Sequence, residues 1–128
     1  MAGFWDAVGV LHHVSLEVRP DDVERTIEFF EIVGFARVPA PESIAQFVTW
    51  LESDGTQIHL IHTTEPTTPL LGHPALVASE FEPTVGRLRE AGFAVEEADQ
   101  LWGEPRAFAV MPSGQRIELM AAPPPPST

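Results

Sequence analysis

Apolar and polar residues alternate in several short stretches of the chain, and a helical pattern interrupts this alternation twice. Residues 10–18 alternate with a period of two and are rich in strand formers, so they predict a first strand. Pro20-Asp21-Asp22 follows and predicts the start of a helix, because acidic residues favour the positive end of the helix dipole. Gly34 is expected to end this helix. Its apolar stripe consists of Val23, Ile27, Phe29 and Phe30.

The remaining pattern completes a first βαβββ unit and then repeats it. In the first half, strands are predicted over 35–38, 44–51 and 57–62, with a proline-bounded turn at 39–41. In the second half, the pattern predicts a strand over 74–78, a helix over 83–91 that Gly92 ends, and strands near 93–97, 106–111 and 116–120. Residues 63–72 carry two prolines and read as the linker between the halves.

The two halves also repeat each other in sequence, at a spacing of 58 to 60 residues. An internal duplication fixes two structurally equivalent halves before any residue is interpreted. The paired segments are Leu11–Leu16 with Leu71–Leu76, Gly34-Phe35 with Gly92-Phe93, and Asp54–Ile61 with Ser113–Met120.

Length and composition limit the classes of protein to consider. A chain of 128 residues has room for one domain, so the halves are expected to share one core. The formal net charge of −12 argues against nucleic acid and anionic membranes as partners. No apolar run has membrane-spanning length and no secretion leader is visible, so a soluble, cytoplasmic protein is expected. Without Cys, any metal must be held by His and carboxylate side chains.

Four side chains of metal-binding type fall at equivalent positions of the halves. His13 corresponds to His73, and His59 corresponds to Glu118. If the two predicted sheets curl together face to face, these four donors converge on one point. Three imidazoles and one carboxylate suit a divalent ion and leave two octahedral positions for water or a chelating substrate. The sequence therefore predicts a divalent metal site, with Zn, Ni, Mn, Co or Fe as candidates.

Strand phase agrees with this site and leaves some roles open. Glu17 shares the predicted face of His13, where its carboxylate is either a general base or a partner of Arg116. His59 is either a metal ligand or a group that moves a proton. Two histidines, His12 and His62, fall outside the strand register of the predicted ligands. They are expected at the surface or in contact with the ligands, without binding the metal themselves. Core or pocket-wall roles, rather than specific stacking, are expected for Phe47, Trp50, Trp102 and Phe108.

Four segments carry a family resemblance: His13–Val18, Phe29–Phe35, Gly72–Val77 and Pro112–Leu119. In this order they resemble the vicinal oxygen chelate superfamily, also called the glyoxalase/bleomycin resistance/dioxygenase family, over residues 11–121. The resemblance implies an α+β fold in which two paired βαβββ modules form a half-open, cup-shaped barrel around a divalent metal. It places His13, His73 and Glu118 on the usual ligand positions, and His59 where members carry a carboxylate, Gln, His or no ligand.

The expected organisation is one domain over residues 9–122, with module one at about 9–62 and module two at about 71–122. An N-terminal extension, 1–8, and a Pro-rich tail, 123–128, flank this domain. The resemblance also implies a homodimer. Whether the modules pair within one chain or between two chains stays open.

The resemblance implies a metal-dependent, glyoxalase-like enzyme that acts on a small substrate with vicinal oxygens. Lyase, isomerase and dioxygenase chemistry all remain open, with the metal acting as a Lewis acid or binding dioxygen. The alternative is a non-catalytic drug-binding protein of the bleomycin-resistance type, since an acidic protein suits a cationic drug. The four metal donors favour the enzyme, because a sequestering protein need not keep them.

Overall fold

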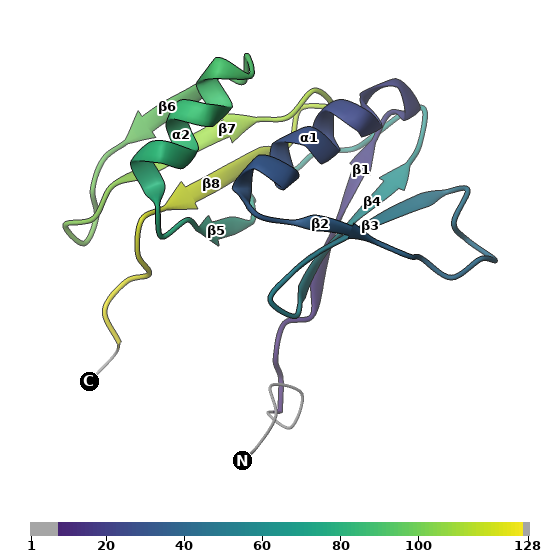
Figure 1. The fold of residues 1–128 in the computed structure, drawn as a ribbon, viewed down its shortest axis with the longest axis horizontal. Coiled ribbons are helices and arrows are strands. Elements are labelled where there is room, and N and C mark those ends of the chain that lie inside the picture. Colours follow the sequence, from purple (N-terminus) through teal and green to yellow (C-terminus); the bar gives the residue numbers. More distant parts are fainter. Residues whose placement is uncertain (1–7, 127–128) are drawn as a thin grey trace.

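The computed structural model describes residues 8–126, which form two βαβββ units (Figure 1). The predicted duplication is therefore confirmed in the order of the elements. The first unit consists of β1 (His13–Val18), a 3-10 turn (Pro20–Asp22), α1 (Val23–Val33), β2 (Ala36–Val38), β3 (Val48–Ser53) and β4 (Thr56–His62). The second consists of β5 (Ala75–Val77), α2 (Phe81–Glu90), β6 (Val95–Ala98), β7 (Arg106–Val110) and β8 (Arg116–Met120).

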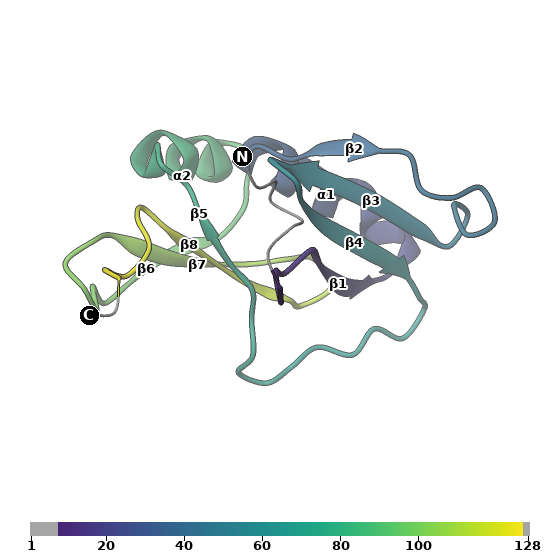
Figure 2. The ribbon, with the colours of Figure 1, turned by 90° about the horizontal axis from the view of Figure 1, so that it is seen from below.

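Each unit forms one four-stranded sheet, and the two sheets have the same topology. The strand orders are β1-β4-β3-β2 and β5-β8-β7-β6. In each sheet the first and last strands of the unit run parallel, and the other pairs run antiparallel. The register places Trp50 opposite His59 and Phe108 opposite Glu118, so the predicted equivalence of His59 and Glu118 holds in three dimensions. The fold is the α+β fold of paired modules, and its sheets do not close into a barrel (Figure 2).

Both helices lie on the same side of the two sheets, over one shared core (Figure 1). Alternation along the central strands explains this arrangement, because every second side chain of a strand faces the helices. Phe29 of α1 is fully buried, and its ring meets that of Phe93 from the second unit edge-on, at 5.5 Å between centroids. The buried strand residues on the helix side are Leu16, Val18, Leu51, Ile58, Leu60, Val95, Ala107, Ala109, Ile117 and Leu119.

Polar contacts also join the two units near the end of β1. The Ser113 hydroxyl accepts a hydrogen bond from the Arg19 backbone N–H at 3.0 Å and donates one to the Asp22 carboxylate at 2.8 Å. The Gln115 side-chain amide donates to the backbone carbonyl of Glu17. The turn that precedes β8 is thereby fixed against the end of β1.

Several element boundaries differ from the sequence-based prediction; the first strand, for example, begins at His13 and not at residue 10. The strand expected over 44–51 begins at Val48, because the segment before it folds as turns. The helix expected from Pro83 begins at Phe81, with Glu80 as its N-cap residue. Pro83 is tolerated there because the first-turn N–H groups of a helix have no partner within the helix. The end of α1 is confirmed at Gly34, whose φ of 121° favours glycine.

The linker between the units, residues 63–74, contains neither helix nor strand and loops out between β4 and β5 (Figure 2). Residues 123–126 likewise form no regular element. Phe4 and Trp5, for which a role in a core cap or a dimer contact stayed open, lie outside the described residues. Within residues 8–126, no helix is long and apolar enough to cross a membrane.

The shared core predicts a large effect of truncating Phe29. Phe29→Ala removes a fully buried ring that touches both units, and we expect it to lower the free energy of unfolding by about 3–5 kcal/mol. Urea denaturation followed by circular dichroism measures this change. The matched control is Leu70→Ala, because Leu70 is 88% exposed and should change stability little. A loss below about 1 kcal/mol in Phe29→Ala would contradict a common core.

Candidate metal centre

The first unit places its two candidate histidines in a stack of rings on the face away from the helices. His59 lies in the middle of β4 and is 8% exposed. The Trp50 ring lies over it at 4.3 Å between centroids and 3° between planes. On its other side is the His13 ring, at 4.0 Å and 18°. Trp50 was expected to be core or pocket wall, and it stacks on a candidate site residue instead.

A hydrogen-bonded chain orients the His59 ring within this stack. The Gln57 amide nitrogen donates to the Glu52 carboxylate at 2.8 Å, so the Gln57 carbonyl oxygen points to His59 Nε2, 2.7 Å away. That oxygen can only accept a hydrogen bond, so the hydrogen of neutral His59 is on Nε2. Nδ1 of His59 therefore carries the lone pair.

The environment of His59 keeps its ring neutral. Burial above all, and then the nearby His13 and His12 rings, together lower the pKa of His59 from 6.5 to about 4. Because the His13 and His59 rings are stacked nearly parallel, their in-plane lone pairs cannot both point at one ion in this arrangement. The geometry therefore favours His59 as a neutral hydrogen-bonding group beside the site.

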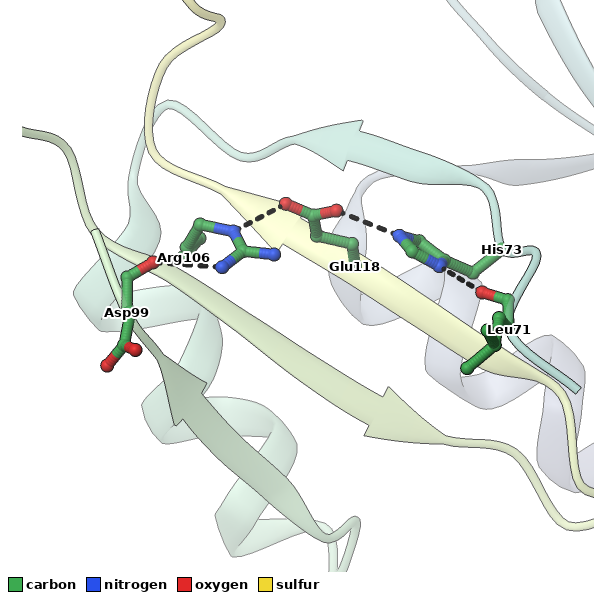
Figure 3. A network of polar contacts seen from close by, with 5 residues as sticks. All are labelled: Leu71, His73, Asp99, Arg106 and Glu118. Atoms are coloured by element: carbon green, nitrogen blue, oxygen red, sulfur yellow. Dashed lines mark hydrogen bonds and ion pairs between the residues drawn. The ribbon is translucent and has the colours of Figure 1, made fainter. Parts of the chain in front are cut away.

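The second unit joins His73 and Glu118 directly, as Figure 3 shows. His73 precedes β5, and Glu118 is in the middle of β8 with 8% of its side chain exposed. His73 Nε2 lies 3.0 Å from Glu118 Oε1. Arg106 of β7 donates from Nε to the other oxygen of Glu118, at 2.9 Å, and also binds the backbone carbonyl of Asp99 at 2.8 Å. The site residue Glu118 is thus held from both sides.

The hydrogen-bonding partners of His73 fit a cation at Nε2. Nδ1 lies 2.9 Å from the backbone carbonyl of Leu71, which only accepts, so Nδ1 must carry a hydrogen. Nε2 faces a carboxylate, which also only accepts when ionised. The ring must therefore be doubly protonated or have a cation in place of the Nε2 proton. The separation of 3.0 Å also suits two neighbouring ligands of one divalent ion, which lie roughly 3.0–3.4 Å apart for bonds near 2.1 Å.

Charge around Glu118 keeps its carboxylate ionised. Burial alone raises the pKa of Glu118, but the hydrogen bonds from Arg106 and His73, together with their charges, outweigh it and lower the pKa. An ionised carboxylate is the form that binds a metal ion. The donor chemistry of the pair therefore fits a divalent ion of the kind expected from the sequence.

Within one chain, the four predicted ligands form two pairs on separate sheets. Neither those four nor any other three His, Asp or Glu residues gather closely enough to hold a metal ion, as far as residues 8–126 are concerned. The four predicted ligands were expected to meet between two sheets that curl face to face. In the described part of a single chain they do not meet. The pairs are His13 with His59 and His73 with Glu118.

The other candidates have contacts of their own. Glu17 accepts a hydrogen bond from the Thr67 backbone N–H at 2.8 Å and so holds the linker. It forms no ion pair with Arg116 in the described structure, although both line a cavity of about 440 Å³ between β1, the linker and β8.

His12 and His13 approach through Nδ1 at 2.9 Å, and His62 Nε2 lies 2.9 Å from the Thr49 hydroxyl. Phe47 is 56% exposed, and the Trp102 indole donates to the Ala122 carbonyl.

Sequence reasoning missed three residues that shape the site. Arg106 was not singled out, although it is on the β7 face that carries Phe108 opposite Glu118. Gln57 shares the face of His59 by strand phase, but its role in orienting that ring depends on Glu52, which comes from the neighbouring strand. Strand phase could have placed all three residues on the site face, but only the register between strands shows which of them touch.

Comparison with known proteins supports the fold. No protein-family model and no curated protein sequence matches the chain. Among solved structures, a glyoxalase family protein from Bacillus anthracis has a TM-score of 0.77 at 20% identity, covering 94% of this chain and 98% of that one. A glyoxalase/dioxygenase from Nostoc punctiforme has a TM-score of 0.70 at 18% identity, covering 91% and 92%. The fosfomycin resistance protein FosX from Listeria monocytogenes has 0.71 at 14%, covering 91% and 96%.

These structures share the fold of this chain over nearly its whole length, so the fold expected from the resemblance is confirmed. Identities of 14 to 20% show a shared fold and do not carry over a substrate or a reaction.

The environment of His59 predicts an unusual titration. In a proton NMR titration, the His59 ring signals should shift with a midpoint near pH 4, where an ordinary histidine titrates near 6.5. Since the unfolded chain takes up this proton first, the contribution of His59 to stability falls as pH drops from 6.5 toward 4. His13→Asn should raise the midpoint, because one nearby positive charge is removed.

The matched control is His62→Asn, because His62 binds Thr49 and is not among the groups that lower the pKa of His59. A wild-type midpoint near 6.5, or equal shifts in both variants, would show that His59 is not enclosed by Trp50 and His13 as described.

Proposed function

We propose that the protein is a divalent-metal-dependent enzyme that acts on a small substrate with vicinal oxygens, by lyase, isomerase or dioxygenase chemistry. The observation that carries this proposal is the His73–Glu118 pair, in which the imidazole faces acceptors at both nitrogens. A backbone carbonyl at Nδ1 is the usual support of a metal-binding histidine, because it fixes the ring with Nε2 free for the ion. Zn, Ni, Mn, Co and Fe all suit nitrogen and carboxylate donors.

A third donor, His13, would come from a second copy of the chain. The two pairs of candidate ligands lie on separate sheets of one chain, so an ion bound by His73 and Glu118 needs a further donor from elsewhere. No helix within residues 8–126 covers the sheet faces that carry these pairs, and these faces expose Ile61 and Val110, at 38% and 53%. A homodimer that brings the first-unit face of one chain against the second-unit face of the other would cover this apolar area and bring three donors together.

The remaining candidates would act on the substrate. When bound, the metal would supply Lewis-acid polarisation of the chelated oxygens. His59 offers a lone pair at Nδ1 from a ring held by Gln57, so it can accept a hydrogen bond from a substrate hydroxyl. Glu17 lines the same cavity as His73, and its carboxylate can accept a proton there.

Metal analysis tests the ligand assignment. Protein purified without a His tag should bind about one equivalent of a divalent transition metal per chain, and His73→Ala and Glu118→Ala should each lose most of it. Inductively coupled plasma mass spectrometry after dialysis measures the content. The matched control is His62→Ala, which removes an imidazole outside both pairs and should keep the metal. Metal retained in the double variant His73→Ala/Glu118→Ala would overturn the site. If wild type takes no metal but binds a cationic antibiotic tightly, the protein is a sequestering protein.

Subunit complementation tests whether two chains build the site. His13→Ala and Glu118→Ala chains, co-expressed with different peptide tags and purified through both, should recover about half of the wild-type metal, although each variant alone has lost it. In such a mixed dimer one site has both substitutions and the other has neither. Recovery of no metal by mixed dimers of normal stability would show that the donors come from one chain, and a monomer in light scattering would overturn the dimer.

A further inference from the structure

One arginine on the site face has no polar partner. The chain contains seven basic residues, all of them arginine. In the described part of the chain, Arg116 is the one arginine that forms neither a hydrogen bond nor an ion pair with another residue. The other six have these partners: Arg19 with Asp22, Arg25 with Glu28, Arg37 with Glu24, Arg87 with Thr84, Arg89 with the Val95 carbonyl, and Arg106 with Glu118. In a protein of net charge −12, an unpaired guanidinium is an exception that needs an explanation.

The guanidinium of Arg116 is held in place without using its N–H donors. It lies over the Phe108 ring at 4.3 Å from the ring centroid. A cation over an aromatic face is attracted to the ring, and stacking leaves the edge of the guanidinium free to bind an anion. Phe108 in turn touches His73 edge-on, at 4.8 Å between centroids. The Phe108 ring therefore contacts both the Arg116 guanidinium and His73, a proposed metal ligand.

The position of Arg116 also fits a substrate that reaches the metal. Arg116 and Glu118 are two residues apart on β8, so they share a face and lie about 7 Å apart along the strand. Arg116 lines the cavity of about 440 Å³ that also contains His73. A small molecule in this cavity could thus reach His73 with one end and Arg116 with the other.

The charges around Arg116 favour a planar monoanion. Arg106 is neutralised by Glu118, which leaves one uncompensated cation on this face. Glu17 lines the same cavity as Arg116, and Glu96 and Glu97 line a second cavity that Arg116 also borders, so a dianion such as a phosphonate would be repelled more strongly than a monoanion. The two parallel donors of a guanidinium match the two oxygens of a carboxylate.

We propose that Arg116 selects substrates that carry a carboxylate at the end remote from the metal-chelating oxygens. This inference names the substrate class of the proposed enzyme, and so it rests on the proposed function. Arg116 would bind the carboxylate through two charge-assisted hydrogen bonds while Phe108 supports the guanidinium from its face. The vicinal oxygens of the same molecule would then reach the ion held by His73 and Glu118.

Binding of matched probes tests the proposal. The probes are 3,4-dihydroxybenzoate, its uncharged amide 3,4-dihydroxybenzamide, and 3,4-dihydroxyphenylphosphonate, measured by isothermal titration calorimetry with zinc-loaded and with metal-free protein. Wild type should bind the benzoate at least tenfold more tightly than the amide, as expected for a charge-assisted bidentate pair. In Arg116→Gln the two should bind equally, with affinity for the amide unchanged. Arg116→Lys should keep part of the preference, because it keeps the charge and loses the paired donors.

The matched control is Arg37→Gln, which removes an exposed arginine that pairs with Glu24 on α1 and should leave the preference intact. No preference in wild type, a preference that survives in Arg116→Gln, or tighter binding of the phosphonate than of the benzoate would each overturn the proposal. The two proposals fail differently. Affinity that is the same with and without zinc counts against the metal centre, whereas the ratio of benzoate to amide reports on Arg116 in either form of the protein.

Discussion

Burial of one face of each sheet against the helices is the constraint on which the rest of this structure depends. Along β4 and β8, Ile58, Leu60, Ile117 and Leu119 are driven into the core. Side chains alternate along a strand, so the residues between them are forced onto the opposite face. That face carries His59 in the first unit and Glu118 in the second. The hydrophobic core on one face of each sheet thus positions the polar residues of the other face.

The two units follow one plan but surround the equivalent position differently. In the first, a neutral imidazole lies between two rings, and an amide and a carboxylate orient it. In the second, a carboxylate lies between an imidazole and a guanidinium. The first arrangement keeps its central imidazole neutral, whereas the second places charged groups on both sides of its central carboxylate. A site built from both faces would combine a neutral hydrogen-bonding imidazole with an ionised metal-binding carboxylate.

Much of this could be predicted from the sequence, because repeats and periodicity are local signals. The duplication predicted two units with the same order of elements, and strand phase placed His59 and Glu118 on the correct faces. What could not be predicted depends on geometry between strands: the stacking of Trp50 on His59, the contact of Arg106 with Glu118, and the start of α2 before Pro83. The separation of the ligands into two pairs was equally out of reach, since periodicity does not say how two sheets are oriented.

The contact of Phe29 with Phe93 has a consequence for the origin of the fold. A half-length chain with one βαβββ unit would expose the part of its helix that now packs against the other unit. Exposed aromatic surface of this kind promotes self-association. A single-unit ancestor would therefore have functioned as a pair of identical chains before its gene was duplicated and fused, and fusion would have allowed each half to diverge at its own polar face.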